Sequence, residues 1–135
     1  MRAVLDPNIL IAALLSPAGA PAQLVGRWLG GEFELVVSET LLAELQRALA
    51  YPKLRGRVLP DEAAAFTTLL RHGAILASDP PDPARRSADR GDDYLLALAE
   101  AERALLVSGD QHLLALADHL PVQTARASLD SPARG

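Results

Sequence analysis

Short apolar runs alternate with helix-like segments along most of this sequence. The runs have the length of buried strands, and they cover residues 3–5, 33–37, 74–77, 104–107 and a last short run around Val122. Strands that alternate with helices are typical of an α/β fold, because a parallel strand pair needs a crossover that is usually a helix. We therefore expect an α/β sandwich with a mainly parallel sheet of four to five strands.

Proline, glycine and capping residues predict where the helices begin and end. Pro7 suits a first helical turn, Ser38 is a good N-cap, and Gly30 follows the end of a helical pattern. The predicted helices cover residues 8–15, 22–29, 38–50, 60–71, 92–103 and 112–117. Residues 78–91 are rich in proline, aspartate and arginine and predict a long loop, which is often a functional feature. We expect one domain over residues 1–127 and a flexible tail over residues 128–135.

Composition narrows the possible functions. A chain of 135 residues that is 50% apolar suits one folded domain. Its aromatic content of 4% argues against a base-stacking RNA platform, and its net charge of −4 argues against a general nucleic-acid coat protein. Cysteine is absent, and no run approaches the ~20 apolar residues of a membrane span. We therefore expect a cytoplasmic protein without a membrane segment.

Four acids that are distant in the sequence are expected near one edge of this sheet. Asp6 directly follows the first strand, Asp110 follows the fourth strand after a short turn, and Asp92 begins a helix. Glu44 lies about six residues into its helix, roughly 9 Å along the axis, and its side chain can lean back toward the helix start. Because the carboxyl ends of parallel strands meet at one edge, where ligands bind, we expect these acids to face one crevice.

Helical phase distinguishes Asp92 from its neighbour Asp93. At 100° per residue, Asp92 shares a face with Leu95, Leu96 and Ala99, which should pack on the sheet. Asp93 points well away from this stripe. An inward acid is costly unless it is paired or bound to a cation, so Asp92 is the stronger candidate ligand.

Clustered carboxylates repel one another unless a cation neutralises them. Hard oxygen ligands suit Mg²⁺ or Mn²⁺, which can activate a water and stabilise charge on a phosphodiester. Cysteine is absent, and the three histidines have no obvious acid–serine partners. The sequence therefore favours a metal-dependent site over covalent catalysis.

Four segments in order resemble the PIN-domain ribonucleases, and more closely the branch that forms the toxin component of toxin–antitoxin pairs. The matching segments are LDPNILIAALLSP, SETLLAELQRALAYPKLR, DRGDDYLLALAEA and LLVSGDQHLLAL, and together they extend over residues 1 to about 117. They place the four acids of the family site on Asp6, Glu44, Asp92 and Asp110. This match of four segments is more specific than any one of them alone.

The resemblance implies a PIN-like three-layer α/β/α sandwich that is an endoribonuclease. Its implied activity is cleavage of single-stranded RNA by a water that Mg²⁺ or Mn²⁺ activates, with Asp6, Glu44, Asp92 and Asp110 as catalytic metal ligands. It also implies a cognate antitoxin protein as partner and a homodimer as the assembly.

Several further residues are expected to support this site. Residues placed behind the ligands are Asp93, Asn8, Ser108 and Asp89, of which Asn8 can hydrogen-bond Asp6 or a water of the metal. Arginines of the long loop that can contact RNA phosphates are Arg85, Arg86 and Arg90. One departure from the family pattern is Pro7, which stands where threonine or serine is usual and removes a hydroxyl from the site.

Other interpretations remain open at this point. Asp6, Asp92 and Asp110 can be helix caps or strand ends, and Glu44 can be an exposed side chain. The chain can be a catalytically inactive PIN-like module that binds RNA or a partner protein. A phosphoacceptor domain is disfavoured because the only lysine, Lys53, is far from the end of the chain where that function needs one. DNA as substrate, and one metal ion or two, stay open.

Overall fold

The structure is a computed structural model of the 135-residue chain, and it describes residues 1–81, 92–118 and 120–130. Five strands form one sheet in the order β3-β2-β1-β4-β5, and all four neighbouring pairs are parallel. The strands are β1 (Arg2–Leu5), β2 (Glu34–Val37), β3 (Ile75–Leu76), β4 (Leu105–Val107) and β5 (Val122–Gln123). This confirms the prediction of a mainly parallel sheet and shows that all its pairings are parallel.

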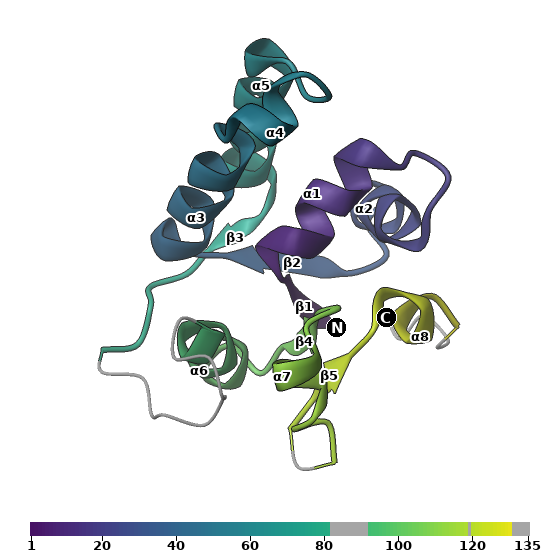
Figure 1. Ribbon diagram of the computed structural model, residues 1–135. Coiled ribbons are helices and arrows are strands. Elements are labelled where there is room, and N and C mark those ends of the chain that lie inside the picture. Colours follow the sequence, from purple (N-terminus) through teal and green to yellow (C-terminus); the bar gives the residue numbers. More distant parts are fainter. Residues whose placement is uncertain (82–91, 119, 131–135) are drawn as a thin grey trace.

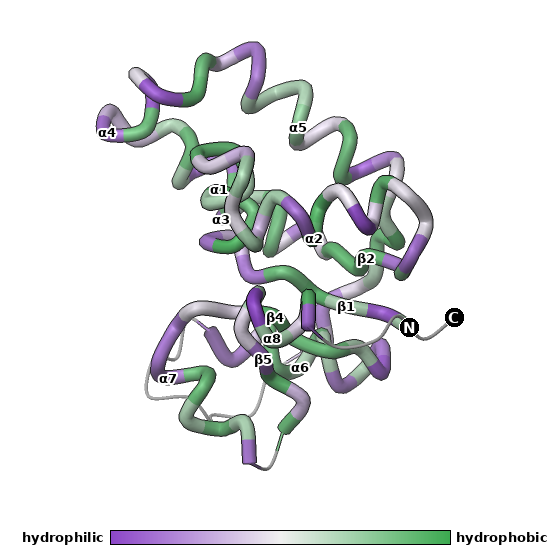
Figure 2. The backbone as a smooth tube through the Cα atoms, turned by 90° about the vertical axis from the view of Figure 1, so that its right-hand side faces the viewer, coloured by the Kyte–Doolittle hydropathy of each residue, from purple (hydrophilic) through white to green (hydrophobic). Residues whose placement is uncertain are grey.

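Helices cover both faces of the sheet. The helices are α1 (Pro7–Leu15), α2 (Ala20–Leu29), α3 (Glu39–Leu49), α4 (Pro52–Arg55), α5 (Pro60–Gly73), α6 (Asp93–Ala101), α7 (Gln111–Leu114) and α8 (Ala125–Asp130). Figures 1 and 2 show α1 to α5 on one side of the sheet and α6 and α7 on the other. This arrangement confirms the predicted α/β/α sandwich.

The core lies on both faces of the central strands. Residues 35–37 of β2, 3–5 of β1 and 106–107 of β4 are all buried, because these strands are covered by helices on both sides. Helix α3 packs Leu41, Leu42 and Leu45 against this centre. Continuous apolar strands of this kind are what a sheet buried on two faces requires.

Two short helices depart from the sequence-based expectations. Residues 52–55 form α4, where the sequence predicted only the end of the preceding helix. Residues 125–130 form α8, whose Leu129 is buried and accepts a hydrogen bond at its carbonyl from Arg27 in α2. Residues 128–130 are therefore part of the fold and not of a flexible tail, whereas residues 131–135 lie outside the described residues.

The helices of the structure can be compared with the length and composition of a membrane span. Within the described ranges, no single helix is long and apolar enough to cross a membrane. Helices α1 and α2 reach that length and composition only when taken together, and they are bent by 99° where they meet.

Two adjacent leucines of α5 test how the core is formed. Leu70 is 0% exposed, whereas Leu69 is 40% exposed. We expect Leu70→Ala to lower the free energy of unfolding by about 2–5 kcal/mol, because it removes buried methyl groups and leaves a cavity. Leu69→Ala is the matched control and should cost less than half as much. Urea unfolding of both variants measures the difference, and equal losses would contradict the assigned burial of α5.

Candidate active site

The strand order reverses between β1 and β4, at the carboxyl ends of these two neighbouring strands. From β1 the chain proceeds to β2 and β3 on one side, and β4 and β5 then form on the other side of β1. In open parallel sheets this reversal of direction is where ligands bind. Leu5 and Val107 are register partners at the ends of β1 and β4, and the Asp6 backbone N–H donates to the Val107 carbonyl at 3.0 Å. Asp6 therefore directly follows β1 at the point where the strand order reverses.

Asp6 is a buried carboxylate with two hydrogen-bond donors. Its side chain is 4% exposed. Asp6 Oδ1 accepts from the backbone N–H of Asn8 at 2.9 Å, and Oδ2 accepts from the Ser108 hydroxyl at 2.8 Å. Burial raises the pKa of Asp6 above its usual value, the two hydrogen bonds oppose this rise, and the negative charge of Asp110 adds to it. Asp6 therefore caps α1 and also lies within the electrostatic reach of a second acid.

Ser108 connects Asp6 to Asp110. Its side chain is fully buried, it donates to Asp6, and its oxygen accepts from the Asp110 backbone N–H at 3.0 Å. Asp110 in turn caps α7, because its Oδ1 accepts from the His112 backbone N–H at 2.7 Å. The capping role considered for Asp110 is thus present, and it fixes this carboxylate within the electrostatic reach of Asp6.

Glu44 contacts an unpredicted residue, Tyr94. The Tyr94 hydroxyl, in the first turn of α6, donates to Glu44 Oε2 in α3. Burial raises the pKa of Tyr94 well above its usual range, and the hydrogen bond to Glu44 and the charges of Glu44, Asp6 and Asp79 raise it further. Tyr94 therefore lies among three acids that come from different parts of the chain.

Asp79 is the acid that the sequence analysis missed. It follows β3, and its Oδ2 accepts from the backbone N–H of Thr40 at the start of α3, at 3.3 Å. Its Oδ1 is buried and has no hydrogen-bond partner among the described residues. The signal for it was present, because an acid shortly after a parallel strand lies at the same edge as Asp6. Asp79 lies in a proline-rich stretch whose composition predicts a loop and not a site residue.

Asp92 and Asp93 differ from the prediction. Asp93 is 4% exposed, whereas Asp92 is half-buried. Helical phase still places Asp93 away from the stripe of Leu95, Leu96 and Ala99, but the expectation that only this stripe is buried is wrong. The buried face of α6 is wider, because it also includes Leu98 on one flank of the stripe and Asp93 on the other. Asp92 occupies the N-cap position of α6, but its side chain makes no capping hydrogen bond to that helix.

Pro7 and Asn8 follow Asp6 at the start of α1. The side chain of Asn8 is exposed, and its contact with Asp6 comes from the backbone N–H instead of the amide. Pro7 is the first residue of α1 and is buried. The other predicted residues, Asp89, Arg85, Arg86 and Arg90, lie outside the described residues.

The acidic side chains are of a type that suits a divalent cation, but those among the described residues do not form a complete coordination site. Carboxylate oxygens are the ligands that Mg²⁺ and Mn²⁺ prefer, and the buried Oδ1 of Asp79 has no partner in the described parts of the chain. Within residues 1–81, 92–118 and 120–130, however, no three acidic or histidine side chains are close enough to hold a metal ion as they stand.

These observations define a parallel α/β protein with acidic side chains at the carboxyl ends of its central strands. Comparison with known families shows which one it is. Residues 2–112 match the PIN domain, and the chain belongs to the PIN domain family. This confirms the family resemblance that the four sequence segments indicated.

Individual proteins are also similar to this chain. The chain is 24% identical over 119 residues to the uncharacterized protein MJ1680 of Methanocaldococcus jannaschii, which covers 87% of this chain and 76% of that protein. Its fold is similar to VapBC2 of Rickettsia felis bound to a promoter DNA fragment, with a TM-score of 0.64, 15% identity and coverage of 92% and 98% of the two chains. VapBC-1 of nontypeable Haemophilus influenzae gives a TM-score of 0.63, 18% identity and coverage of 93% and 99%. At these identities the solved structures establish the fold.

The raised pKa of Asp6 predicts a pH dependence of stability without metal. The folded chain binds this proton more tightly than the unfolded chain, so stability falls as pH rises from the unfolded pKa, about 4, through the raised folded pKa. Asp6→Asn should remove this fall, at most about 1.4 kcal/mol per pH unit. Wild type should therefore lose stability relative to the variant between pH 4 and neutral pH.

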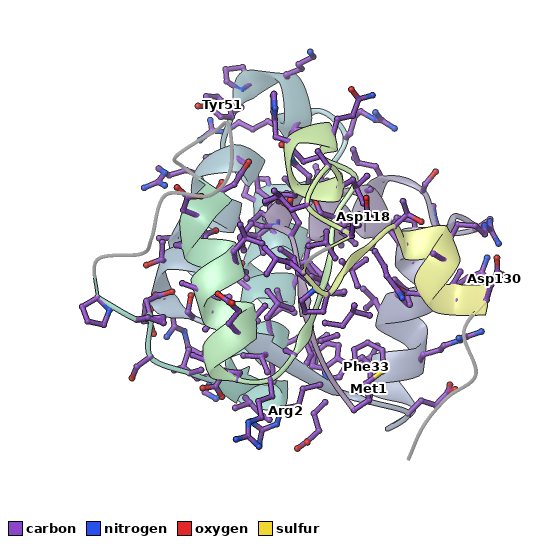
Figure 3. All side chains as sticks on the ribbon, turned by 90° about the horizontal axis from the view of Figure 1, so that it is seen from below. Met1, Arg2, Phe33, Tyr51, Asp118 and Asp130 are labelled. Atoms are coloured by element: carbon purple, nitrogen blue, oxygen red, sulfur yellow. The ribbon has the colours of Figure 1, made fainter. Side chains whose placement is uncertain are left out.

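Urea unfolding at several pH values in EDTA measures this difference. Asp118→Asn is the matched control, because it removes one negative charge from an exposed position (Figure 3). Parallel pH profiles for wild type and Asp6→Asn would show that the burial of Asp6 does not disfavour its charged form.

Proposed function

We propose that this protein is a metal-dependent endoribonuclease that cleaves single-stranded RNA. Members of the PIN family are generally nucleases. The observation that carries the proposal is that the buried carboxylate of Asp6 lies within the electrostatic reach of Asp110 at the carboxyl ends of β1 and β4, with Ser108 bonded to the Asp6 carboxylate and to the Asp110 backbone N–H. Burial of Asp6 disfavours the charged form of its carboxylate, and a bound cation would offset that cost in free energy.

The proposed metal ligands are Asp6, Glu44, Asp92 and Asp110, and the proposed ion is Mg²⁺ or Mn²⁺. PIN-family nucleases generally use divalent metals. A divalent cation bound by these carboxylates supplies a water activated for attack on a phosphodiester and offsets negative charge on the phosphate. Asp93 is the alternative to Asp92 as the ligand from the start of α6, because it is the more deeply buried of the two.

The protein's own contribution is to hold the carboxylates in place. The Asn8 N–H and the Ser108 hydroxyl fix the two oxygens of Asp6. The start of α7 fixes Asp110 through the His112 N–H. Because these donors belong to the backbone or to a buried side chain, Asp6 and Asp110 stay close to their positions whether or not a cation is bound.

We further propose that the protein is the toxin of a toxin–antitoxin pair. Two similar folds belong to VapBC proteins, and the four sequence segments resemble the toxin branch of the family. A cognate antitoxin, a homodimer and a cytoplasmic location belong to this proposal. The functional unit would be a single PIN-like domain that includes residues 1–127.

A second candidate function is a catalytically inactive PIN-like module that binds RNA or a partner protein. The observation that favours it is Pro7, which is buried at the first position of α1 and supplies neither a hydroxyl nor an N–H beside Asp6. The retention of Asp6, Glu44, Asp92 and Asp110 favours the enzyme.

Cleavage of a labelled single-stranded RNA distinguishes the two functions. We expect the wild type to cut with Mg²⁺ or Mn²⁺ and not with EDTA. Asp6→Asn should reduce the rate by more than the roughly 10- to 100-fold loss that is typical of groups that only orient a ligand. Parallel assays of Asp92→Asn and Asp93→Asn identify the ligand of α6, and Asp118→Asn should cut like wild type.

Two other results of this assay would decide against the proposed enzyme. Binding of Mn²⁺ or RNA without any cutting would favour the inactive module. Cutting that survives both EDTA and Asp6→Asn would refute the metal-dependent site.

A further inference from the structure

Tyr94 joins the two helical layers of the molecule at the acidic site. It lies in the first turn of α6, and its hydroxyl donates to Glu44 of α3, fifty residues away in the sequence. Figure 1 shows α3 and α6 on opposite sides of the sheet. We propose that Tyr94 is a positioning residue, whose hydrogen bond fixes the Glu44 carboxylate in the acidic site. This inference rests on the proposed function, in which Glu44 is a metal ligand.

Glu44 needs such a contact because of its place in the fold. It lies in the second turn of α3, is half-buried, and has a long side chain that can adopt several rotamers. Asp6 and Asp110 are fixed by backbone donors, whereas the hydrogen bond that the structure gives Glu44 comes from the Tyr94 hydroxyl. Loss of this donor leaves the carboxylate without the contact that selects one rotamer.

The bond leaves one carboxylate oxygen for a cation. Tyr94 donates to Oε2, and among the described residues no hydrogen bond is made to Oε1. Groups that hydrogen-bond a metal-ligating carboxylate orient it and tune its affinity. Tyr94 therefore acts through Glu44 and not on the reacting atoms.

A phenol suits this position for an electrostatic reason. The acids that act on Tyr94 are Glu44 from α3, Asp6 from the end of β1 and Asp79 after β3. A cationic donor placed among them would neutralise the negative charge that attracts a divalent ion. The neutral hydroxyl orients one carboxylate and leaves the total charge of the site unchanged.

The first test removes only this hydroxyl. We expect Tyr94→Phe to weaken Mn²⁺ binding, measured by titration calorimetry, by roughly 10- to 100-fold, and to slow RNA cleavage by a similar factor. The matched control is Tyr51→Phe, because Tyr51 is the only other tyrosine and is 64% exposed at the periphery of the molecule (Figure 3). It should bind Mn²⁺ and cleave RNA like wild type.

A double-mutant cycle tests whether Tyr94 acts through Glu44. In a Glu44→Gln background, Tyr94→Phe should cause little further loss of Mn²⁺ affinity, because the oriented ligand is already gone. The same four proteins, melted in EDTA, should show non-additive shifts of the unfolding midpoint if the hydrogen bond is present without metal. Independent, additive losses of Mn²⁺ affinity would overturn the positioning role.

The outcomes separate this inference from the proposed function. If wild type binds Mn²⁺ and cleaves RNA while Tyr94→Phe does both equally well, the positioning role is wrong and the nuclease stands. A lower unfolding midpoint for Tyr94→Phe with unchanged Mn²⁺ affinity would assign Tyr94 to packing alone, which also overturns the inference. If wild type neither binds Mn²⁺ nor cleaves RNA, both proposals fail.

Discussion

The carboxylate of Asp6 is buried at the end of the central strand, and burying a charge is costly unless it is compensated. Two hydrogen-bond donors from different parts of the chain supply that compensation. The start of α1 provides the Asn8 N–H, and the residue after β4 provides the Ser108 hydroxyl. The compensation is incomplete, because the pKa of Asp6 is still raised. The ends of the two central strands and the start of α1 are therefore held together around the carboxylate of Asp6.

The same arrangement explains why the site is assembled from distant segments. Each parallel strand ends at one edge, so each following residue or helix start contributes there without any local motif. Asp6 follows β1, Asp79 follows β3 and Asp110 follows β4. Topology brings these acids together, and short-range contacts then set the position of each one.

Much of this was predictable from the sequence. The strand and helix pattern indicated the parallel sheet, and the position of Asp6 and Asp110 after apolar strands indicated their common edge. Helical phase failed for Asp93, because it assumes that a helix has one narrow buried face, whereas α6 is buried over most of its circumference. The Tyr94–Glu44 contact could not be predicted, since it depends on how two helices on opposite faces meet. Helices α4 and α8 have four and six residues, which is too short for a periodic pattern to be recognised.

The two outer strands have a consequence for how copies of this protein can associate. β3 and β5 are the borders of the sheet, and each has only two residues. Borders this short expose few backbone donors and acceptors to a neighbouring chain, which protects against uncontrolled strand addition and fibre growth. Association through helix surfaces and side chains is therefore favoured over pairing of these border strands. Its strength and selectivity can then change by surface substitution while the sheet at the centre stays the same.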